Sequence, residues 1–127
     1  MTQASFYKTP GMVDGAPYSA AVRYGDLVWT CGQLGMDAEG NFPPSFEEQV
    51  NLAFDNLETA LKTAGADLKR VIKISAFVLD INQLDAFNAV YRQRVNMTNP
   101  PVRTTVQIAD FQDGIHVEID AVAFATS

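Results

Sequence analysis

Two strand-like runs lie in residues Pro100–Ala123, PPVRTTVQIADFQDGIHVEIDAVA, and the rest of the 127-residue chain is arranged around them. β-Branched residues follow Arg103, while Ile115–Phe124 alternates apolar with polar side chains, as a half-buried strand does. The polar segment Asp110–Gly114 between them predicts a hairpin or a short connection. If the strands pair, Arg103 and Glu118 come into one neighbourhood. The pattern alone favours an ion pair on a half-exposed sheet and a functional pair about equally.

Upstream of this stretch the sequence predicts two helices and a central strand. Ser45 and Glu48 form a capping box, and apolar residues then recur every three or four positions until Gly65, a typical residue after a helix end. Val71–Leu79 is apolar on nearly both faces and is therefore expected to be a central strand. Asn82 is expected to cap a second helix, which ends before an Asn-Pro-Pro sequence.

The N-terminal part predicts two more strands and a loop. Ala20–Tyr24 and Leu27–Cys31 are joined by Gly25-Asp26, a two-residue hairpin signal. Residues 1–18 are expected to form a loop with a short strand at Ser5–Lys8. The resulting order is strand, strand, helix, strand, helix, strand, strand. It predicts an α+β fold, a mixed β-sheet with two helices packed on one face.

The sheet face opposite the helices is expected to keep apolar side chains. Such a face needs a further cover, and in a chain of this length self-association supplies it most simply. We therefore expect a homo-oligomer. The apolar residues expected on this face are Val22, Val71, Phe77, Leu79 and Phe124.

Composition and charge restrict the classes of partner. Hydrophobic residues make up 47% of the chain and charged residues 19%, as in ordinary globular proteins, and we expect one domain of residues 1–127. The net charge of −6, without any Lys/Arg cluster, disfavours a nucleic-acid partner. The single cysteine, Cys31, and the lack of a long apolar run predict a cytoplasmic protein that does not enter membranes.

Few residues offer chemistry. His116 and Cys31 are far apart in sequence and form neither a metal site nor a nucleophile triad, and the glycines fit no nucleotide-binding pattern, so no metal and no cofactor is expected. Arg103 and Glu118 remain, together with Tyr18. An arginine can bind a carboxylate through two parallel hydrogen bonds, and a glutamate can accept a proton from water.

The same C-terminal stretch resembles the signature of the Rid family, the reactive-intermediate (enamine/imine) deaminases, also called the YjgF family. Residues 101–106, PVRTTV, are similar to P-x-R-[ST]-x-V, and Val117–Ala123 to V-E-I-[DE]-A-[VI]-A. Further resemblances are Ala16-Pro17-Tyr18, Thr30-Cys31-Gly32-Gln33 and Phe87–Tyr91, so the likeness extends over nearly the whole chain.

The resemblance implies a chorismate mutase-like fold, a homotrimer and ligand clefts between neighbouring subunits. Arg103 would bind the substrate carboxylate, Glu118 would position or activate the attacking water, and Tyr18 would come from the neighbour of the chain that supplies Arg103. The implied pocket-lining residues are Tyr18, Cys31, Gly32, Asn88 and Thr105. Two departures concern the substrate: Thr105 replaces a frequent cysteine, and Phe111-Gln112 replaces the usual Leu-Pro.

The activity implied by the resemblance is cofactor-free hydrolysis of reactive enamines and imines, such as 2-aminoacrylate, to 2-keto acids and ammonium. The resemblance thus implies a hydrolase similar to 2-iminobutanoate/2-iminopropanoate deaminases. Three alternatives stay open. One is a keto-acid-binding or regulatory trimer without turnover. Another is a ribonuclease or translation inhibitor, which the net charge of −6 disfavours. The third is a specialised deaminase acting on aminomuconate.

Overall fold

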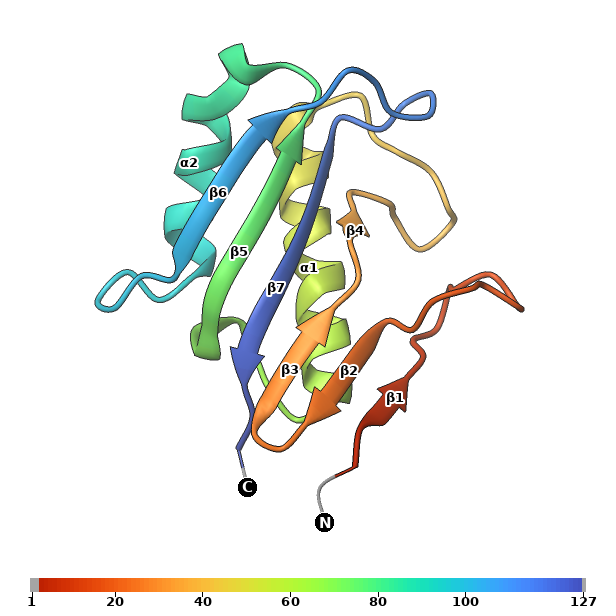
Figure 1. Cartoon of the computed structure of the whole chain (residues 1–127). Coiled ribbons are helices and arrows are strands. Elements are labelled where there is room, and N and C mark those ends of the chain that lie inside the picture. Colours follow the sequence, from red (N-terminus) through yellow and green to blue (C-terminus); the bar gives the residue numbers. More distant parts are fainter. Residues whose placement is uncertain (1–2, 127) are drawn as a thin grey trace.

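A mixed β-sheet is the main layer of the structure, a computed structural model that describes residues 3–126 (Figure 1). Its strands are β1 (Ser5–Tyr7), β2 (Ala21–Tyr24), β3 (Leu27–Thr30), β4 (Gln33–Leu34), β5 (Val71–Val78), β6 (Val102–Gln107) and β7 (Val117–Phe124). The helices are α1 (Phe46–Thr63) and α2 (Leu84–Arg94), with 3-10 turns η1 (Leu68–Arg70) and η2 (Ile81–Gln83). The strand order is β1-β2-β3-β7-β5-β6, and β4 also pairs with β7.

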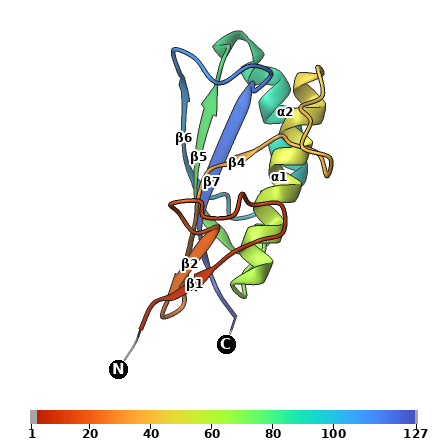
Figure 2. The same ribbon diagram turned by 90° about the vertical axis from the view of Figure 1, so that its right-hand side faces the viewer.

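Both helices cover the same side of the sheet, as the sequence predicts (Figure 2). The local signals at the ends of α1 are confirmed: the Ser45 hydroxyl accepts a hydrogen bond from the Glu48 amide at 3.3 Å. Gly65 has a φ of +92°, and the next amide, of Ala66, donates to the Leu61 carbonyl at 2.9 Å. This left-handed turn satisfies carbonyl groups that the helix end leaves free. The chain can thereby turn towards β5.

Strand β5 is the central strand that its apolar sequence predicts. It pairs with β7 in antiparallel and with β6 in parallel orientation. Of the hairpin and the short connection predicted for the C-terminal stretch, the hairpin is wrong, because β5 lies between the two strands. A parallel pairing of β5 with β6 requires a crossover, and α2 supplies it. Residues 108–116 then connect β6 to β7 across the end of β5.

Two local predictions are wrong for identifiable reasons. Asn82 does not cap α2: the Asp80 carboxylate accepts from the Asn82 amide at 2.9 Å and caps η2, after which α2 begins at Leu84. Val71 does not lie on the uncovered face. The register of β5 against β7 shifts between Val71 and Lys73, and this bulge turns Val71 into the core, where it is 4% exposed.

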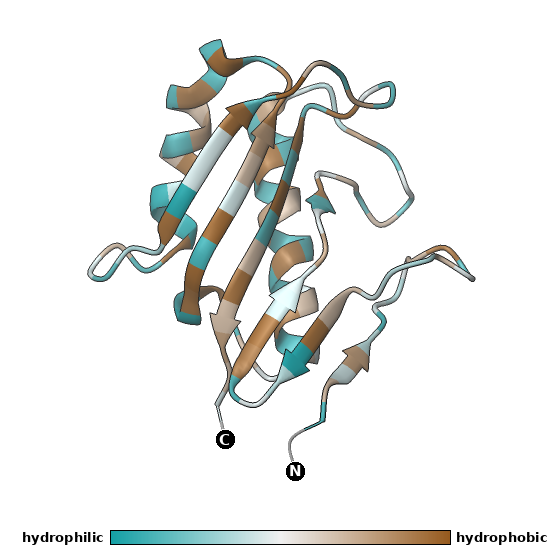
Figure 3. Ribbon diagram, in the orientation of Figure 1, coloured by the Kyte–Doolittle hydropathy of each residue, from teal (hydrophilic) through white to brown (hydrophobic). Residues whose placement is uncertain are grey.

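The sheet face away from the helices, called the open face from here on, is markedly apolar. Alternation along β7 buries one set of side chains under the helices and leaves the other set on the open side. In Figure 3 the ribbons of β2 and β3 carry brown, hydrophobic segments. Cross-strand pairs such as Val22 with Trp29 and Leu27 with Phe124 join the outward apolar side chains of β2, β3 and the end of β7. The predicted residues Val22, Phe77 and Phe124 belong to the open face. Its exposed apolar side chains are Phe6, Tyr24, Leu27, Trp29, Val102, Val106 and Phe124.

Gln49 on α1 is the buried polar side chain of the core, with 1% exposure. Its amide nitrogen donates to the carbonyls of Pro43 at 2.8 Å and Gly114 at 2.7 Å, and its amide oxygen accepts from the His116 amide at 3.0 Å. The side chain thus ties the loop before α1 to the connection before β7. No helix between residues 3 and 126 is long and apolar enough to cross a membrane.

The Gln49→Leu variant is expected to lower the free energy of unfolding by about 2–4 kcal/mol, because it leaves three buried backbone groups without partners. Urea denaturation measures this. Gln93→Leu on the exposed side of α2 is the matched control, with an expected change within about 0.5 kcal/mol. Equal effects of the two substitutions would contradict the role assigned to Gln49.

Candidate functional site

Arg103 lies on the edge strand β6 and directs its side chain towards α2. Its Nη1 donates to Oδ1 of Asn88 at 2.7 Å. The guanidinium carbon lies 4.7 Å from the ring centre of Tyr91 and 5.6 Å from that of Phe87, within the range of cation–π contacts. One amide and two rings therefore hold the guanidinium in a defined position.

These contacts leave the positive charge of Arg103 without a carboxylate. Among residues 3–126 the ion-paired arginines are Arg23, Arg70 and Arg94, and Arg103 is not one of them. Burial raises the pKa of the Tyr91 phenol, against an opposing effect of Arg103, so the ring is neutral near pH 7. A half-buried, oriented and uncompensated guanidinium is a natural binding site for an anion.

Thr105 lies on the same face of β6, two residues after Arg103. Arg103 is opposite Ile74 of β5 and Thr105 is opposite Ala76, and both of these β5 residues are buried under the helices. The Thr105 hydroxyl is buried and has no hydrogen-bond partner within residues 3–126. Arg103, Asn88 and Thr105 form one cluster, called the edge group here.

Glu118 lies on β7 and faces the open side of the sheet. Gly32 lets its side chain cross the backbone after β3, since a Cβ at residue 32 would lie 2.6 Å from the Glu118 carboxyl carbon. Cys31 is next to them: its thiol donates to the Gly32 carbonyl at 3.5 Å and accepts from the Gln33 amide at 3.3 Å. Cys31, Gly32 and Glu118 are called the open-face group.

Burial and like charges alter the titration of the open-face group. Burial raises the pKa of the Glu118 carboxyl, and the Asp120 carboxylate raises it further. The pKa of Asp120 is itself raised by burial, against lowering by a Ser75 hydrogen bond and by Lys73. Burial is also the main reason for the raised pKa of the Cys31 thiol. The thiol is therefore protonated near neutral pH and is a poor nucleophile.

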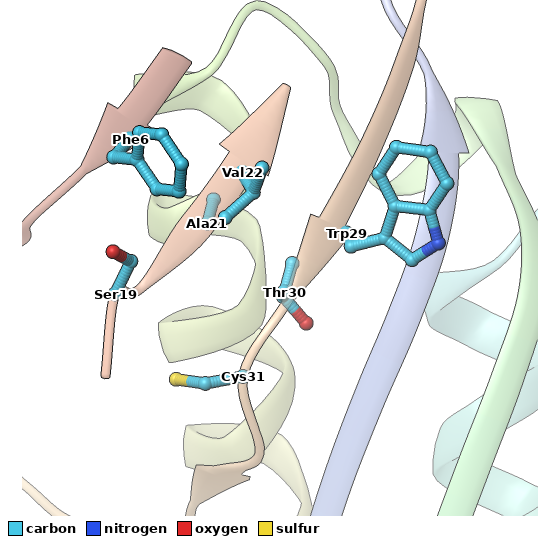
Figure 4. Close-up of a pocket in the computed structure, with 7 residues that line it drawn as sticks. All are labelled: Phe6, Ser19, Ala21, Val22, Trp29, Thr30 and Cys31. Carbon is cyan, nitrogen blue, oxygen red and sulfur yellow. The ribbon is translucent and has the colours of Figure 1, made fainter. Parts of the chain in front are cut away.

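A pocket of about 350 Å³ lies beside Cys31 on the open side of β2 and β3 (Figure 4). Tyr18 precedes this pocket in the loop before β2; its side chain is 55% exposed, and its carbonyl accepts from the Lys8 ammonium at 2.5 Å. The residues that line the pocket are Phe6, Ser19, Ala21, Val22, Trp29, Thr30 and Cys31.

The two groups do not meet within one chain. The edge group faces the helices from β6, the outermost strand, whereas Glu118 faces away from them on β7, beyond β5. The expectation that strand pairing would bring Arg103 and Glu118 together is therefore wrong for a single chain. Their separation follows from the insertion of β5. In the described part of the chain, moreover, no cluster of three or more His, Cys, Asp or Glu side chains could hold a metal.

A family model described as Endoribonuclease L-PSP matches residues 12–125. The chain belongs to this family, the Rid family. The human protein named 2-iminobutanoate/2-iminopropanoate deaminase is 35% identical over 91% of this chain and 84% of its own length. The Schizosaccharomyces pombe protein named mmf2, mitochondrial, is 36% identical over 86% of this chain and 88% of its own length. The structure of Escherichia coli TdcF with bound serine has a TM-score of 0.85 and 28% identity, covering 96% of this chain and 99% of that one.

Phe87 and Tyr91 belong to the site region of this Rid protein, although the sequence analysis named only Asn88 of this segment as a pocket-lining residue. Tyr91 lies three residues after Asn88, on the same side of the helix, and Phe87 lies one turn before Tyr91. The sequence signal for this arrangement is an asparagine, Asn88, with aromatic residues one position before it and three positions after it, followed by the strand that carries Arg103.

The raised pKa values of Glu118 and Asp120 give the stability of this Rid protein a defined pH dependence. A carboxyl whose pKa is higher in the folded than in the unfolded state stabilises the fold below its ordinary pKa, and this contribution is lost as the pH rises through the raised value. Glu118→Gln cannot ionise. Its free energy of unfolding, relative to the parent, is expected to be higher at about pH 8 than at about pH 4.

Denaturation by urea at both pH values, with intrinsic Trp29 fluorescence as the signal, measures this difference. A difference between variant and parent that stays constant from acid to alkaline pH would contradict the raised pKa of Glu118.

Proposed function

We propose that this protein is a cofactor-free deaminase of 2-imino acids. It hydrolyses them, and the enamines such as 2-aminoacrylate that tautomerise to them, to 2-keto acids and ammonium. The observation that carries the proposal is the guanidinium of Arg103, oriented by Asn88 and two rings and not neutralised by any carboxylate of residues 3–126. The names of the human relative and of the serine-bound TdcF structure support a small ligand with a carboxylate.

In this proposal Arg103 binds the carboxylate of the substrate. The neutral partner of Arg103 is essential to that role. The Asn88 oxygen orients the guanidinium and leaves its charge in place, whereas an aspartate at this position would cancel the charge. Orienting a reactant in this way can supply several kcal/mol of barrier reduction. Thr105 contributes its unpartnered hydroxyl beside the bound carboxylate.

Glu118 activates the water. The imine carbon is already electrophilic, so the reaction needs only a water molecule in place and an acceptor for its proton. The imine reacts in its protonated form: the water oxygen bonds to the imine carbon, the C=N electron pair moves to nitrogen, and Glu118 takes one water proton. Glu118 then gives this proton to the amino nitrogen of the carbinolamine. As the C–N bond breaks, the hydroxyl oxygen forms the carbonyl and its proton passes through Glu118 to the departing ammonia, so that a keto acid and ammonium leave. A carboxyl with a raised pKa accepts a proton more readily than an ordinary one, which suits this step.

The complete site lies between two chains in this proposal. Arg103 and Glu118 face opposite sides of the sheet, so a substrate can contact both only where the edge group of one chain meets the open-face group of another. The exposed apolar side chains of the open face support such an assembly. We propose a homotrimer with clefts between neighbouring subunits, in which Tyr18, Cys31 and Gly32 line the cleft on the side of Glu118.

Arg103→Ala is expected to lower kcat/KM for small 2-imino acids about 10³-fold, and Glu118→Gln about 10²-fold, because loss of orientation costs more than loss of one proton acceptor. A dehydratase generates 2-aminoacrylate in situ, and its disappearance is followed with and without each protein. Lys62→Gln, on the exposed side of α1, is the charge-matched control and is expected to retain parent activity.

Equal activity of the Arg103→Ala variant and the parent would contradict the carboxylate-binding role. A folded, assembled parent without any acceleration would instead favour a keto-acid-binding protein that does not turn over its ligand.

Trp29→Glu is expected to dissociate the assembly, because it places a charge in the middle of the apolar open face, where Trp29 pairs with Val22 and Val122. Sedimentation velocity should give the mass of a trimer for the parent and of a monomer for the variant. Deaminase activity should be lost together with the assembly. An active monomer would show that one chain contains the whole site.

A further inference from the structure

A second pocket, of about 260 Å³, lies beside Arg103 between the C-terminal half of α2 and the segment that leads into β6. Arg92 and Arg103 line it, with Asn88 and Tyr91 of α2 as polar and aromatic neighbours. Met97 and the two prolines that precede β6 form its apolar wall. Neither the proposed hydrolysis of a small imine nor the open-face group requires Arg92.

The pocket carries two positive charges and no negative one, in a chain whose net charge is −6. Arg92 is exposed and forms no ion pair or side-chain hydrogen bond with any residue of 3–126, whereas Arg23, Arg70 and Arg94 are ion-paired. Arg94, two residues on, shows the contrast: it binds the Asp55 carboxylate at 2.6 Å and the Asn51 carbonyl at 3.1 Å. Both cations of the pocket are therefore available to a ligand.

The two arginines reach the pocket from two elements, Arg92 from α2 and Arg103 from β6. Asn88 and Arg92 are four residues apart and lie on the same side of the helix, about 6 Å apart along its axis. The Asn88 oxygen holds Arg103 at 2.7 Å, so Asn88 marks the position of the first cation. Arg92 lines the same pocket one turn further along α2, so one ligand in the pocket can contact both cations.

We propose that this pocket selects ligands with a second carboxylate, so that the substrates are 2-imino diacids. This inference rests on the proposed function, since Arg103 takes the carboxylate next to the imine. Arg92 then binds the carboxylate at the end of the side chain, and Met97 contacts the carbons between them. The volume lies just below the range of about 300–1,000 Å³ typical of small-molecule sites, which suits a short diacid.

Isothermal titration with keto acids, the products of the proposed reaction, tests the ligand class without turnover. The probes are 2-oxoglutarate and 2-oxopentanoate, which differ by one terminal carboxylate. The parent is expected to bind the diacid about tenfold more tightly than the monoacid, and Arg92→Gln to abolish that preference. Arg92→Lys should keep most of it. Lys62→Gln removes one charge far from the pocket and should leave the preference as in the parent.

A parent that binds both keto acids equally, or an Arg92→Gln variant that keeps the preference for the diacid, would overturn the inference. The same holds if Lys62→Gln reduces the preference as much as Arg92→Gln, because the effect would then come from net charge alone. The kinetic assay separates this failure from that of the proposed function. Imine hydrolysis by the parent without any diacid preference overturns only the ligand class, whereas a diacid preference without hydrolysis overturns only the activity.

Discussion

Hydrogen bonding along both edges of β5 is the constraint on which the rest of the structure depends. A strand that is buried and apolar needs partners on both sides, and β5 obtains β7 on one edge and β6 on the other. That arrangement places the two strands of the C-terminal stretch apart although they follow each other in sequence. Arg103 consequently faces the helices at the sheet edge, and Glu118 faces the open side.

The open face connects this constraint to the assembly. Helices cover one face of the sheet only, so the outward side chains of β2, β3 and β7 have no cover from the described chain. Burying them against another copy is favourable by about 25 cal/mol for each Å² of apolar surface removed from water. The same association would bring an edge group next to an open-face group. In the proposed function, stability and catalysis therefore require the same contact.

Local signals in the sequence predicted most of the fold. The helix cap at Ser45, the glycine after α1 and the two-residue turn at Gly25-Asp26 depend on neighbouring residues alone, and the structure confirms each of them. The apolar pattern of β5 gave its central position. The residues of β6 alone did not predict its pairing partner. β6 pairs in parallel with β5 because α2 returns the chain to the same end of the sheet at which β5 began. The bulge that turns Val71 into the core is likewise invisible in a strand pattern.

The candidate site was likewise predictable in part only. The residue types of Arg103 and Glu118 indicated carboxylate binding and proton transfer. The face of the sheet on which each of them lies follows from the strand order and not from the motif. The roles of Asn88, Phe87 and Tyr91 around the guanidinium became visible only when α2 packed against β6. Arg92 gave no signal, since an arginine in the last turn of a helix is also explained by the helix dipole.

Activity of mixed assemblies tests the central claim, that one site takes Arg103 from one chain and Glu118 from the next. Arg103→Ala and Glu118→Gln chains are unfolded together, refolded at equal amounts and compared with each variant refolded alone. In a cyclic trimer with sites between subunits, random mixing gives about a quarter of the sites both intact groups. The account predicts that the mixture recovers about a quarter of the parent activity. A mixture no more active than the variants alone would show that both groups act within one chain and would contradict the account.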